Sequence, residues 1–220
     1  MLKQFLQELT HQNNYNIVLA DGEFSNLKIF HSLIKNADTL ISCDGATKHL
    51  IKHNIEPSVI IGDCDSLSPE IIAKFCHKII RIAEQNSNDL TKAINYLHNK
   101  KLDNVIILGA TGKREDHTLA NIALLVEYSK QLKKVCIVSK YGVFTIHNGI
   151  TQIKCQIGQQ ISFFAVKNNT MISCPELKWP LNNFNLSNWY NGTLNQATAV
   201  ELNIETNGDI ILYRSFEIKL

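Results

Sequence analysis

The sequence is poor in charged residues and in proline, and it lacks the patterns of several protein classes. Of its 220 residues, 19% are charged and four are proline, whereas about a quarter of the residues in a globular chain are charged. Its hydrophobic content of 45% argues against an intrinsically disordered chain. A net charge of +2, with Lys and Arg scattered rather than clustered, argues against a nucleic-acid partner.

The cysteines and the apolar runs exclude further classes. No two of the six cysteines form a Cys-x-x-Cys pair or a zinc-like spacing, which predicts reduced, mostly core cysteines in a cytoplasmic protein. No apolar run is long enough to span a membrane. Residues 1–14 carry apolar side chains at helical spacing and lack the continuous apolar core of a signal peptide. We therefore expect no membrane partner.

What the first 140 residues do contain is an alternation of apolar runs with amphipathic segments. We expect helices at 25–35, 46–53, 89–99 and 117–130, the third behind a cap at Asn88, and a further helix that opens at Ser68-Pro69, with Ser68 as its cap. We expect strands at 16–20, 39–43, 58–62, 78–82, 104–108 and 134–139. This alternation predicts an α/β domain, residues 1–140, with a mostly parallel, Rossmann-like sheet covered on both faces.

After Lys140 the helical period disappears. Short alternating runs, separated by the turn signals at 148–149, 158–159 and 207–208, predict a small all-β sandwich domain over residues 141–220. Two of these signals are Asn-Gly pairs, which favour hairpins. The Asn-rich segment 182–195 is expected to be a long loop.

The segment Gly62-Asp63-Cys64-Asp65-Ser66 follows a predicted core strand. If the extended backbone continues, Asp63 and Asp65 point to the same side and Cys64 points into the core. Two carboxylates about 5 Å apart repel by roughly 3 kcal/mol at an effective dielectric of about 20. A Mg²⁺ ion would relieve that repulsion. The alternative is a solvated loop with two turn-forming aspartates.

Carboxylates also follow the other predicted strands. Asp21 follows the first strand, Asp44 the second and Asp89 the fourth. Because open α/β sheets bind ligands beyond the carboxyl ends of their strands, this recurrence predicts a shared metal-phosphate site.

A glycine-rich loop, residues 109–117, supplies positive charge after the fifth strand. Its glycines permit close approach to an anion, and Arg114 offers a planar fork for phosphate oxygens. The loop is not a Walker A motif, because the required spacing of glycines and lysine is absent. The alternative is a plain connection in which Asp116 caps the following helix.

In combination, these motifs resemble the thiamine pyrophosphokinase family. The similar segments occur in the family's order along nearly the whole chain: Asp44-Gly45-Ala46, Gly62 to Leu67, Glu84 to Asp89, Gly112 to Asn121, and Leu177 to Leu181. The resemblance implies an N-terminal α/β catalytic domain, a C-terminal β-sandwich domain and a homodimer. It also implies transfer of the diphosphate of ATP to the hydroxyl of thiamine, with Mg²⁺ required and AMP released.

The resemblance also assigns site residues. Metal ligation and catalysis fall to Asp44, Asp63, Asp65 and Asp89, and Arg114 would stabilise charge on the phosphates. ATP binding is expected of Asp21, Gly45, Gly112, Arg114, Asp116, His117 and Asn121. Thiamine binding is expected of Gln85, Asp89, Trp179, Thr193 and Asn195, with active sites near the subunit interface, where Gln85 and Trp179 could come from different subunits.

The chain departs from the family pattern at a few positions. Glu176 stands where the family usually has Gly, Leu194 where it has Ser, and Lys113 where it has Gly; Glu84 and Asn88 stand for Asp and Thr. The acceptor is therefore less firmly assigned than diphosphate transfer itself. Two alternatives stay open: a diphosphokinase for another small alcohol such as a pterin, and a nucleotide or thiamine sensor without turnover.

Overall fold

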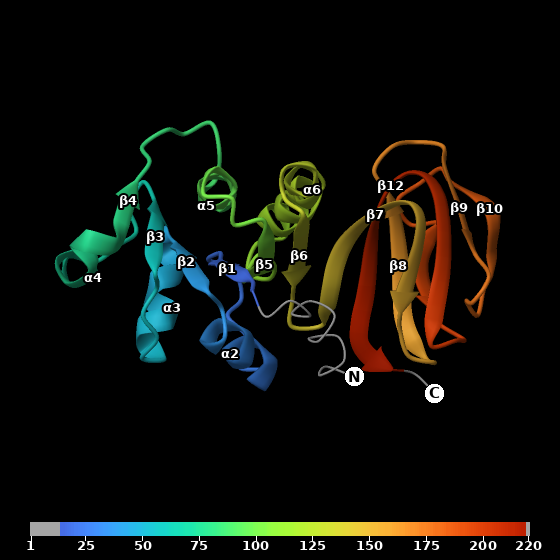
Figure 1. Cartoon of the computed structure of the whole chain (residues 1–220), viewed down its shortest axis with the longest axis horizontal. Helices are drawn as coiled ribbons and strands as arrows, with labels where there is room; N and C mark the ends of the chain where they lie inside the picture. Colours follow the sequence, from blue (N-terminus) through green and yellow to red (C-terminus); the bar gives the residue numbers. More distant parts are fainter. Residues whose placement is uncertain (1–13, 219–220) are drawn as a thin grey trace. The chain divides into compact units, whose positions relative to one another are not determined.

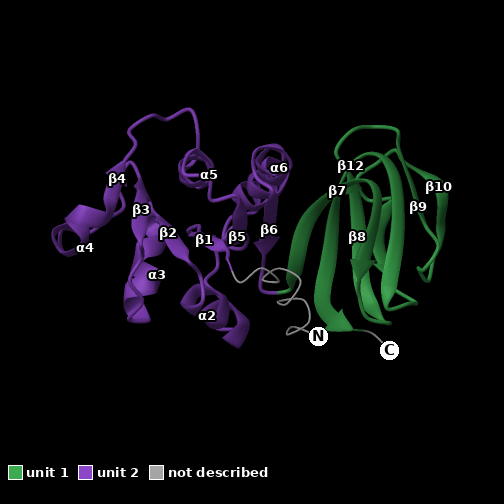
Figure 2. Ribbon diagram, viewed as in Figure 1, with its two compact units in different colours: residues 1–5, 141–220 green, residues 6–140 purple. Residues whose placement is uncertain are grey.

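The computed structural model describes residues 14–218, and it divides at residues 140 and 141 into two compact units (Figure 2). The first is an α/β domain and the second is built from β-strands (Figure 1). The helical spacing noted for residues 1–14 falls almost wholly outside the described residues. None of the described helices is both long and apolar enough to cross a membrane.

The elements of the α/β unit follow the predicted alternation. Its strands are β1 (Asn16–Leu19), β2 (Thr39–Cys43), β3 (Val59–Gly62), β4 (Ile79–Arg81), β5 (Asn104–Leu108) and β6 (Lys134–Val138). Its α-helices are α2 (Lys28–Lys35), α3 (Thr47–Lys52), α4 (Pro69–Phe75), α5 (Asp89–Asn99) and α6 (Glu115–Gln131), and the short 3₁₀ turns are η1 (Asp44–Ala46) and η2 (Cys76–Lys78). The predicted caps are confirmed: the side chain of Ser68 accepts from the N–H of Ile71, and that of Asn88 from Thr91.

All six of these strands run parallel, in the order β6-β5-β1-β2-β3-β4. The chain steps outward from β1 to β4, then returns through α5 to place β5 on the other side of β1. Helices α2 and α3 lie on one side of the strands, and α5 and α6 on the other (Figure 1). The strand order therefore reverses between β1 and β5, which is the point where open α/β sheets bind ligands.

The strands of this sheet are continuous apolar runs, which explains why helices cover the sheet on both faces. Every residue of β1 is buried, as are the last four of β2 and β5. Helix α5 packs on β1, β2 and β3 through an apolar face that includes Leu90, Ile94 and Leu97. At its carboxyl end, each strand leads into a polar loop. Because the strands run parallel, these loops lie at the same edge of the sheet.

The second unit contains β7 (Gly142–Lys154), β8 (Gln159–Ala165), β9 (Thr170–Cys174), β10 (Leu181–Leu186), β11 (Gly192–Gln196) and β12 (Glu201–Ile218). All of the pairings among them are antiparallel. Strand β12 pairs with β7 along its length, while its other edge pairs first with β9, at Glu205 and Thr206, and then with β8 from Ile210 onward.

The two Asn-Gly pairs do not form hairpins, and that prediction is wrong. Both lie inside long strands, opposite one another: Gly149 pairs with Thr206, and the register then shifts before Ile210. The extra residues form a β-bulge, in which the N–H of Met171 donates to Asn207 Oδ1 at 2.8 Å. The bulge lies where β12 exchanges β9 for β8 as its neighbour, so the glycines allow a change of partner rather than a reversal of the chain. The third signal, at 158–159, does mark a turn.

The prediction of a long loop at 182–195 is also wrong. It contains β10 and β11, which pair with β9 and β8 and leave residues 187–191 as the connection. In β10 the end residues Leu181 and Leu186 are buried and the four between them are exposed. Such a polar strand carries almost no apolar alternation for a sequence pattern to detect.

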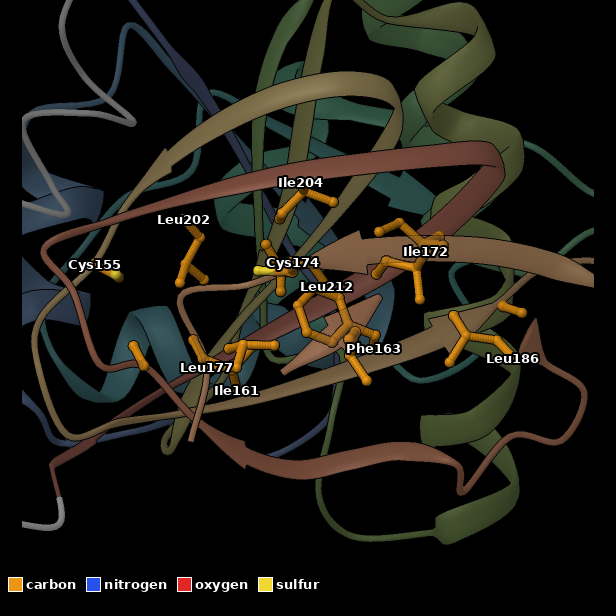
Figure 3. Packing of buried hydrophobic residues seen from close by; sticks show 14 residues of the cluster. Cys155, Ile161, Phe163, Ile172, Cys174, Leu177, Leu186, Leu202, Ile204 and Leu212 are labelled. Carbon is orange, nitrogen blue, oxygen red and sulfur yellow. The ribbon is translucent and has the colours of Figure 1, made fainter. Parts of the chain in front are cut away.

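Alternating apolar residues from several of these strands form one core (Figure 3). Phe163 of β8, Cys174 of β9 and Leu212 of β12 lie together at its centre, each fully buried. None of the six cysteines, all of which lie within the described residues, forms a disulfide; four are buried, Cys64 is half-buried, and Cys76 is exposed. The prediction that most of the cysteines lie in the core is thus confirmed, with Cys64 and Cys76 as the exceptions.

Candidate active site

Backbone hydrogen bonds join the loops that follow β1 and β5. The N–H of Gly22 donates to the carbonyl of Gly109 at 2.6 Å, and the N–H of Glu23 donates to that of Thr111 at 2.8 Å. Gly109 has φ +66°, and a Cβ there would lie 2.3 Å from the carbonyl oxygen of Ala20. Only glycine permits this approach, so the two loops are fixed at the point where the strand order reverses.

Asp44 and Asp89 both lie close to Gly62, at the ends of β2 and β3. A Cβ on Gly62 would be 2.6 Å from the Cβ of Asp44 and 3.1 Å from Asp89 Oδ2. The sequence feature that brings the carboxylates this close is therefore the glycine at the end of β3. Gly45 has the same role one strand away, because a Cβ there would lie 2.6 Å from Asp21 Oδ2.

Asp44 is the most buried carboxylate of the site, with 2% of its surface exposed. Its Oδ2 accepts from the N–H of Ser66 at 3.2 Å, whereas its Oδ1 is buried without a hydrogen-bond partner. Burial, together with the nearby carboxyls of Asp63 and Asp89, raises the pKa of Asp44. A buried carboxylate oxygen with no donor is destabilising unless a proton or a cation neutralises it, so Asp44 suits either of the two.

Asp63 is held by its own loop. Its Oδ1 accepts from the N–H of Asp65, and its Oδ2 from Gln85 Nε2, both at 3.2 Å. These two donors lower the pKa of Asp63. Gln85 and Asp63, assigned to thiamine and metal from the sequence, are therefore in contact.

The condition for the same-side prediction, an extended backbone from Asp63 to Asp65, is not met. The backbone leaves the extended conformation at Cys64, where φ is +69°. Asp65 pairs with Arg81 at 3.6 Å, and 75% of its side chain is exposed. Cys64 nevertheless packs against the core cluster of Ile60 and Phe75, as expected.

A residue that the sequence analysis missed is Lys92, whose Nζ donates to Asp89 Oδ1 at 3.1 Å. It is buried on α5, with 4% of its side chain exposed. The sequence does contain a signal for this contact: the Asp89-x-x-Lys92 spacing places both side chains on one face of a helix.

Asp21 is the centre of a mixed-charge group. It contacts Lys113 (2.9 Å), Lys48 (3.2 Å) and His49 (3.3 Å). Although burial opposes it, the hydrogen bonds from Lys113 and Lys48 lower the pKa of Asp21. Lys113 has φ +61°, a conformation that suits the glycine of the family pattern. Its contacts with the carboxylate and the carbonyl of Asp21 offset that strain.

Helix α6 starts at Glu115, two residues earlier than predicted, with Arg114 at the N-cap. Arg114 makes a two-bond contact with Asp116, at 3.0 and 2.5 Å, and lowers the pKa of that carboxyl to about 2. Asp116 therefore does not cap the helix, although its Oδ1 accepts from the N–H of His117. Asn121 donates to the carbonyl of Ala110 at 2.9 Å and so supports the glycine-rich loop. Gly112 in that loop has φ +79°.

The remaining predicted residues lie in the β unit. Asn195 is buried, donates to the carbonyl of Trp179 at 2.7 Å and accepts from its N–H at 3.2 Å. Trp179 is 57% exposed, with Lys178 Nζ 5.2 Å from its ring centre. Thr193 is turned to the carbonyl of Tyr190 (2.7 Å), and Leu194 is 78% exposed. The structure thus brings Trp179 and Asn195 together, while Thr193 is occupied locally.

Within residues 14–218, no three His, Cys, Asp or Glu side chains form a group that could hold a metal ion. Mg²⁺ does not need such a cage, because it commonly uses one or two carboxylates with substrate phosphates and water. The hard oxygen donors of Asp44, Asp63 and Asp89, and above all the unpartnered Asp44 Oδ1, fit that ion.

Comparisons with known proteins agree with this chemistry. Residues 30–137 match the family model described as "Thiamin pyrophosphokinase, catalytic domain", and residues 142–213 match "Thiamin pyrophosphokinase, substrate-binding domain". Thiamin pyrophosphokinase 1 of Caenorhabditis elegans is 23% identical over 82% of this chain and 80% of its own. Thiamine pyrophosphokinase of Bacillus subtilis is 33% identical over 46% of this chain and 49% of its own.

Solved structures show the same fold. The crystal structure of thiamine pyrophosphokinase from Bacillus subtilis has a TM-score of 0.77 at 26% identity, covering 93% of this chain and 100% of that one. Yeast thiamin pyrophosphokinase has a TM-score of 0.80 at 20% identity, covering 96% and 89%. Neither the pterin kinase nor the sensor alternative is favoured by these matches. The chain belongs to the thiamin pyrophosphokinase family and is a thiamine diphosphokinase.

Proposed function

We propose that the α/β unit, residues 1–140, is a Rossmann-like catalytic domain that binds Mg²⁺ and ATP, and that residues 141–220 form a β-sandwich that binds thiamine. The reaction transfers the diphosphate of ATP to the hydroxyl of thiamine and releases AMP. The observation that carries the metal assignment is the buried, unpartnered Oδ1 of Asp44 beside Gly62 and Asp89.

Asp44, Asp63 and Asp89 would hold Mg²⁺ from the protein side. When bound, the ion would neutralise phosphate charge and help to keep the triphosphate in line with the acceptor. Asp65 would join them by leaving Arg81. Because that salt bridge is exposed, it contributes only about 0–1 kcal/mol, so the carboxylate is available to a stronger cation.

The nucleotide would lie across the reversal point of the strand order. Its phosphates would meet the N-terminus of α6 and the backbone N–H groups of the glycine-rich loop. Arg114 would exchange Asp116 for a phosphate oxygen, which offers the same two-bond geometry. Gly45, His117 and Asn121 would shape the pocket around Asp21.

The acceptor hydroxyl must lose a proton as it attacks the β-phosphorus. Asp89 would orient or deprotonate it, because its carboxylate lies at the end of the sheet beside Gly62. Gln85, held by Asp63, would contact the acceptor from the same side.

Thiamine carries a cationic ring and a flat pyrimidine, and both suit an aromatic face. The exposed indole of Trp179 would supply it, held in place by Asn195, with Thr193 in place of the missing family serine. In a homodimer, Gln85 and Trp179 would come from different subunits and close one pocket. We place the enzyme in the cytoplasm, because most of its six cysteines are core residues and none forms a disulfide.

Two experiments test the proposal. Removing Mg²⁺ with a chelator should abolish AMP formation, and adding it back should restore it; activity without a divalent cation would contradict the metal assignment. For the shared pocket, inactive Asp63→Asn and thiamine-binding-deficient Trp179→Ala proteins are mixed and allowed to exchange subunits. Recovery of activity supports a site built from two subunits, and no recovery despite exchange contradicts it.

A further inference from the structure

Lys92 is a buried lysine whose partner is an expected catalytic carboxylate. Its side chain is 4% exposed, and its Nζ lies 3.1 Å from Asp89 Oδ1, one turn earlier on α5. The chain contains a second acid-lysine pair with the same spacing, Glu127 and Lys130 on α6, at 2.8 Å. That pair is 59% and 56% exposed. The two pairs share geometry and differ in burial, so they provide a natural comparison.

Burial changes what the contact does. An exposed pair contributes little, because water screens both charges. A buried ammonium, in contrast, is strongly destabilising unless a carboxylate accompanies it. Asp89 is only 30% exposed itself, so Lys92 holds its Oδ1 firmly. The other oxygen, Oδ2, is left beside Gly62, and Lys92 thereby selects which oxygen faces the site.

Lys92 also offsets the charge of the carboxylates around it. Asp44, Asp63 and Asp89 converge at the ends of β2 and β3. The pKa of Asp63 is lowered first by the N–H of Asp65 and by Gln85, and the positive charge of Lys92 adds to that effect. Its influence therefore reaches beyond its direct partner.

We infer that Lys92 is a positioning residue: it is a built-in cation that neutralises part of the carboxylate group and fixes Asp89 before a divalent ion binds. Because it shares the carboxylates with that ion, it also weakens divalent binding in the absence of nucleotide. This inference rests on the proposed metal site, although not on the identity of the acceptor.

The test measures Mn²⁺ binding to the full-length, nucleotide-free protein by electron paramagnetic resonance. Lys92→Met removes the charge at similar volume, and Lys92→Gln removes the charge but keeps a hydrogen-bond donor for Asp89. Both should bind Mn²⁺ about tenfold more tightly than the wild type, because a unit charge within a few ångströms is removed from a half-buried site. Lys130→Met, the control, should bind Mn²⁺ as the wild type does.

Two further readouts separate positioning from a structural role. In thermal unfolding, Mn²⁺ should raise the Tm of Lys92→Met more than that of the wild type, because the ion replaces the missing ammonium. In kinetics, kcat should fall about 10–100-fold, as for other residues that orient a ligand, while the KM for Mg-ATP does not rise.

Unchanged Mn²⁺ affinity in both Lys92 variants would overturn the inference, and so would weaker affinity. If Lys92→Met does not fold, Lys92→Gln gives the same test. If the proposed function were wrong, the wild-type protein would form no AMP from Mg-ATP and thiamine. That result is measured separately from Mn²⁺ binding, so failure of the function and failure of this inference are distinguishable.

Discussion

The two units of the chain present different surfaces to solvent. The α/β unit exposes three large hydrophobic side chains within its described part: Leu27, Ile72 and Leu119. The described part of the β unit exposes nine, including Trp179, Trp189 and Tyr190. The α/β unit instead has two groups of ionisable side chains at one sheet edge, an acidic group around Asp44 and a mixed-charge group around Asp21.

This difference fits the proposed division between an α/β unit that carries the chemistry and a β unit that binds most of the acceptor. A triphosphate with a divalent cation needs charges of both signs at fixed positions, and parallel strands that end at one edge supply them. A flat, partly apolar cation such as thiamine needs an aromatic face and few charges. We therefore expect substitutions in the α/β unit to affect turnover, and those in the β unit to affect acceptor binding or stability.

The largest expected effect comes from the acidic group. Asp63→Asn should lower kcat at least about 10³-fold, because it removes a ligand and charge from the proposed Mg²⁺ site. Its Tm should stay near that of the wild type, because this half-buried side chain makes only polar contacts. Asp65→Asn should lower kcat as well, through the ion that draws Asp65 from Arg81. Near-normal turnover in Asp65→Asn would remove that residue from the site.

The second largest effect is expected from the positively charged side of the same sheet edge in the α/β unit. Arg114→Gln should lower kcat/KM for Mg-ATP by about 10²-fold, since a planar donor aimed at developing phosphate charge is lost. Lys130→Gln on the same helix is the control, because its partner Glu127 is exposed and remote from the proposed site. Equal effects in steady-state kinetics would mean that Arg114 acts only through overall charge.

In the β unit, a single histidine should make stability depend on pH. Burial and the charge of Arg214 lower the pKa of His147 to about 4. The unfolded chain therefore takes up the proton first, and the stability contribution, full above the unfolded pKa of about 6.5, is lost as pH falls toward 4. The free energy of unfolding should fall by about 2.5 kcal/mol between about pH 7 and about pH 4.5.

Tryptophan fluorescence during urea unfolding measures this, because both tryptophans of the chain, Trp179 and Trp189, lie in the β unit. His147→Gln should remove most of the pH dependence. A variant that keeps the full dependence would show that other groups in the unit cause it.

The smallest expected effect tests how Trp179 is held. Asn195→Ala breaks the two hydrogen bonds to the backbone of Trp179, and should raise the KM for thiamine about tenfold while leaving that for Mg-ATP unchanged. The matched change is Asn203→Ala in the same unit, whose side chain contacts Glu176 and Gln152 instead. A rise in both KM values would contradict the division of labour between the units.

The sequence predicted the α/β unit better than the β unit for a physical reason. Buried parallel strands are continuous apolar runs, and helices such as α5 carry caps and an apolar face, so local pattern and fold agree. In the β unit, the Asn207-Gly208 pair forms a bulge because β7 continues alongside, which is a tertiary fact. The Asn-rich β10 is paired but nearly unburied, so no apolar pattern marks it.

The same distinction between local pattern and tertiary packing applies to the predicted site residues. That Asp44 and Asp89 would meet was predictable from the strand ends, because topology fixes where those ends lie. The direction of Asp65 was not, because it depends on one positive φ at Cys64. Lys92 was missed because a lysine on a helix is ordinarily a solvated residue, and only packing shows that it is buried.

The most direct test of the account is the identity of the nucleotide product. Purified protein is incubated with Mg-ATP and thiamine, and the nucleotides and thiamine species are separated by chromatography. The account predicts AMP and thiamine diphosphate in equal amounts, with neither formed by Asp63→Asn. ADP with thiamine monophosphate would contradict it, because the site would then transfer a single phosphoryl group.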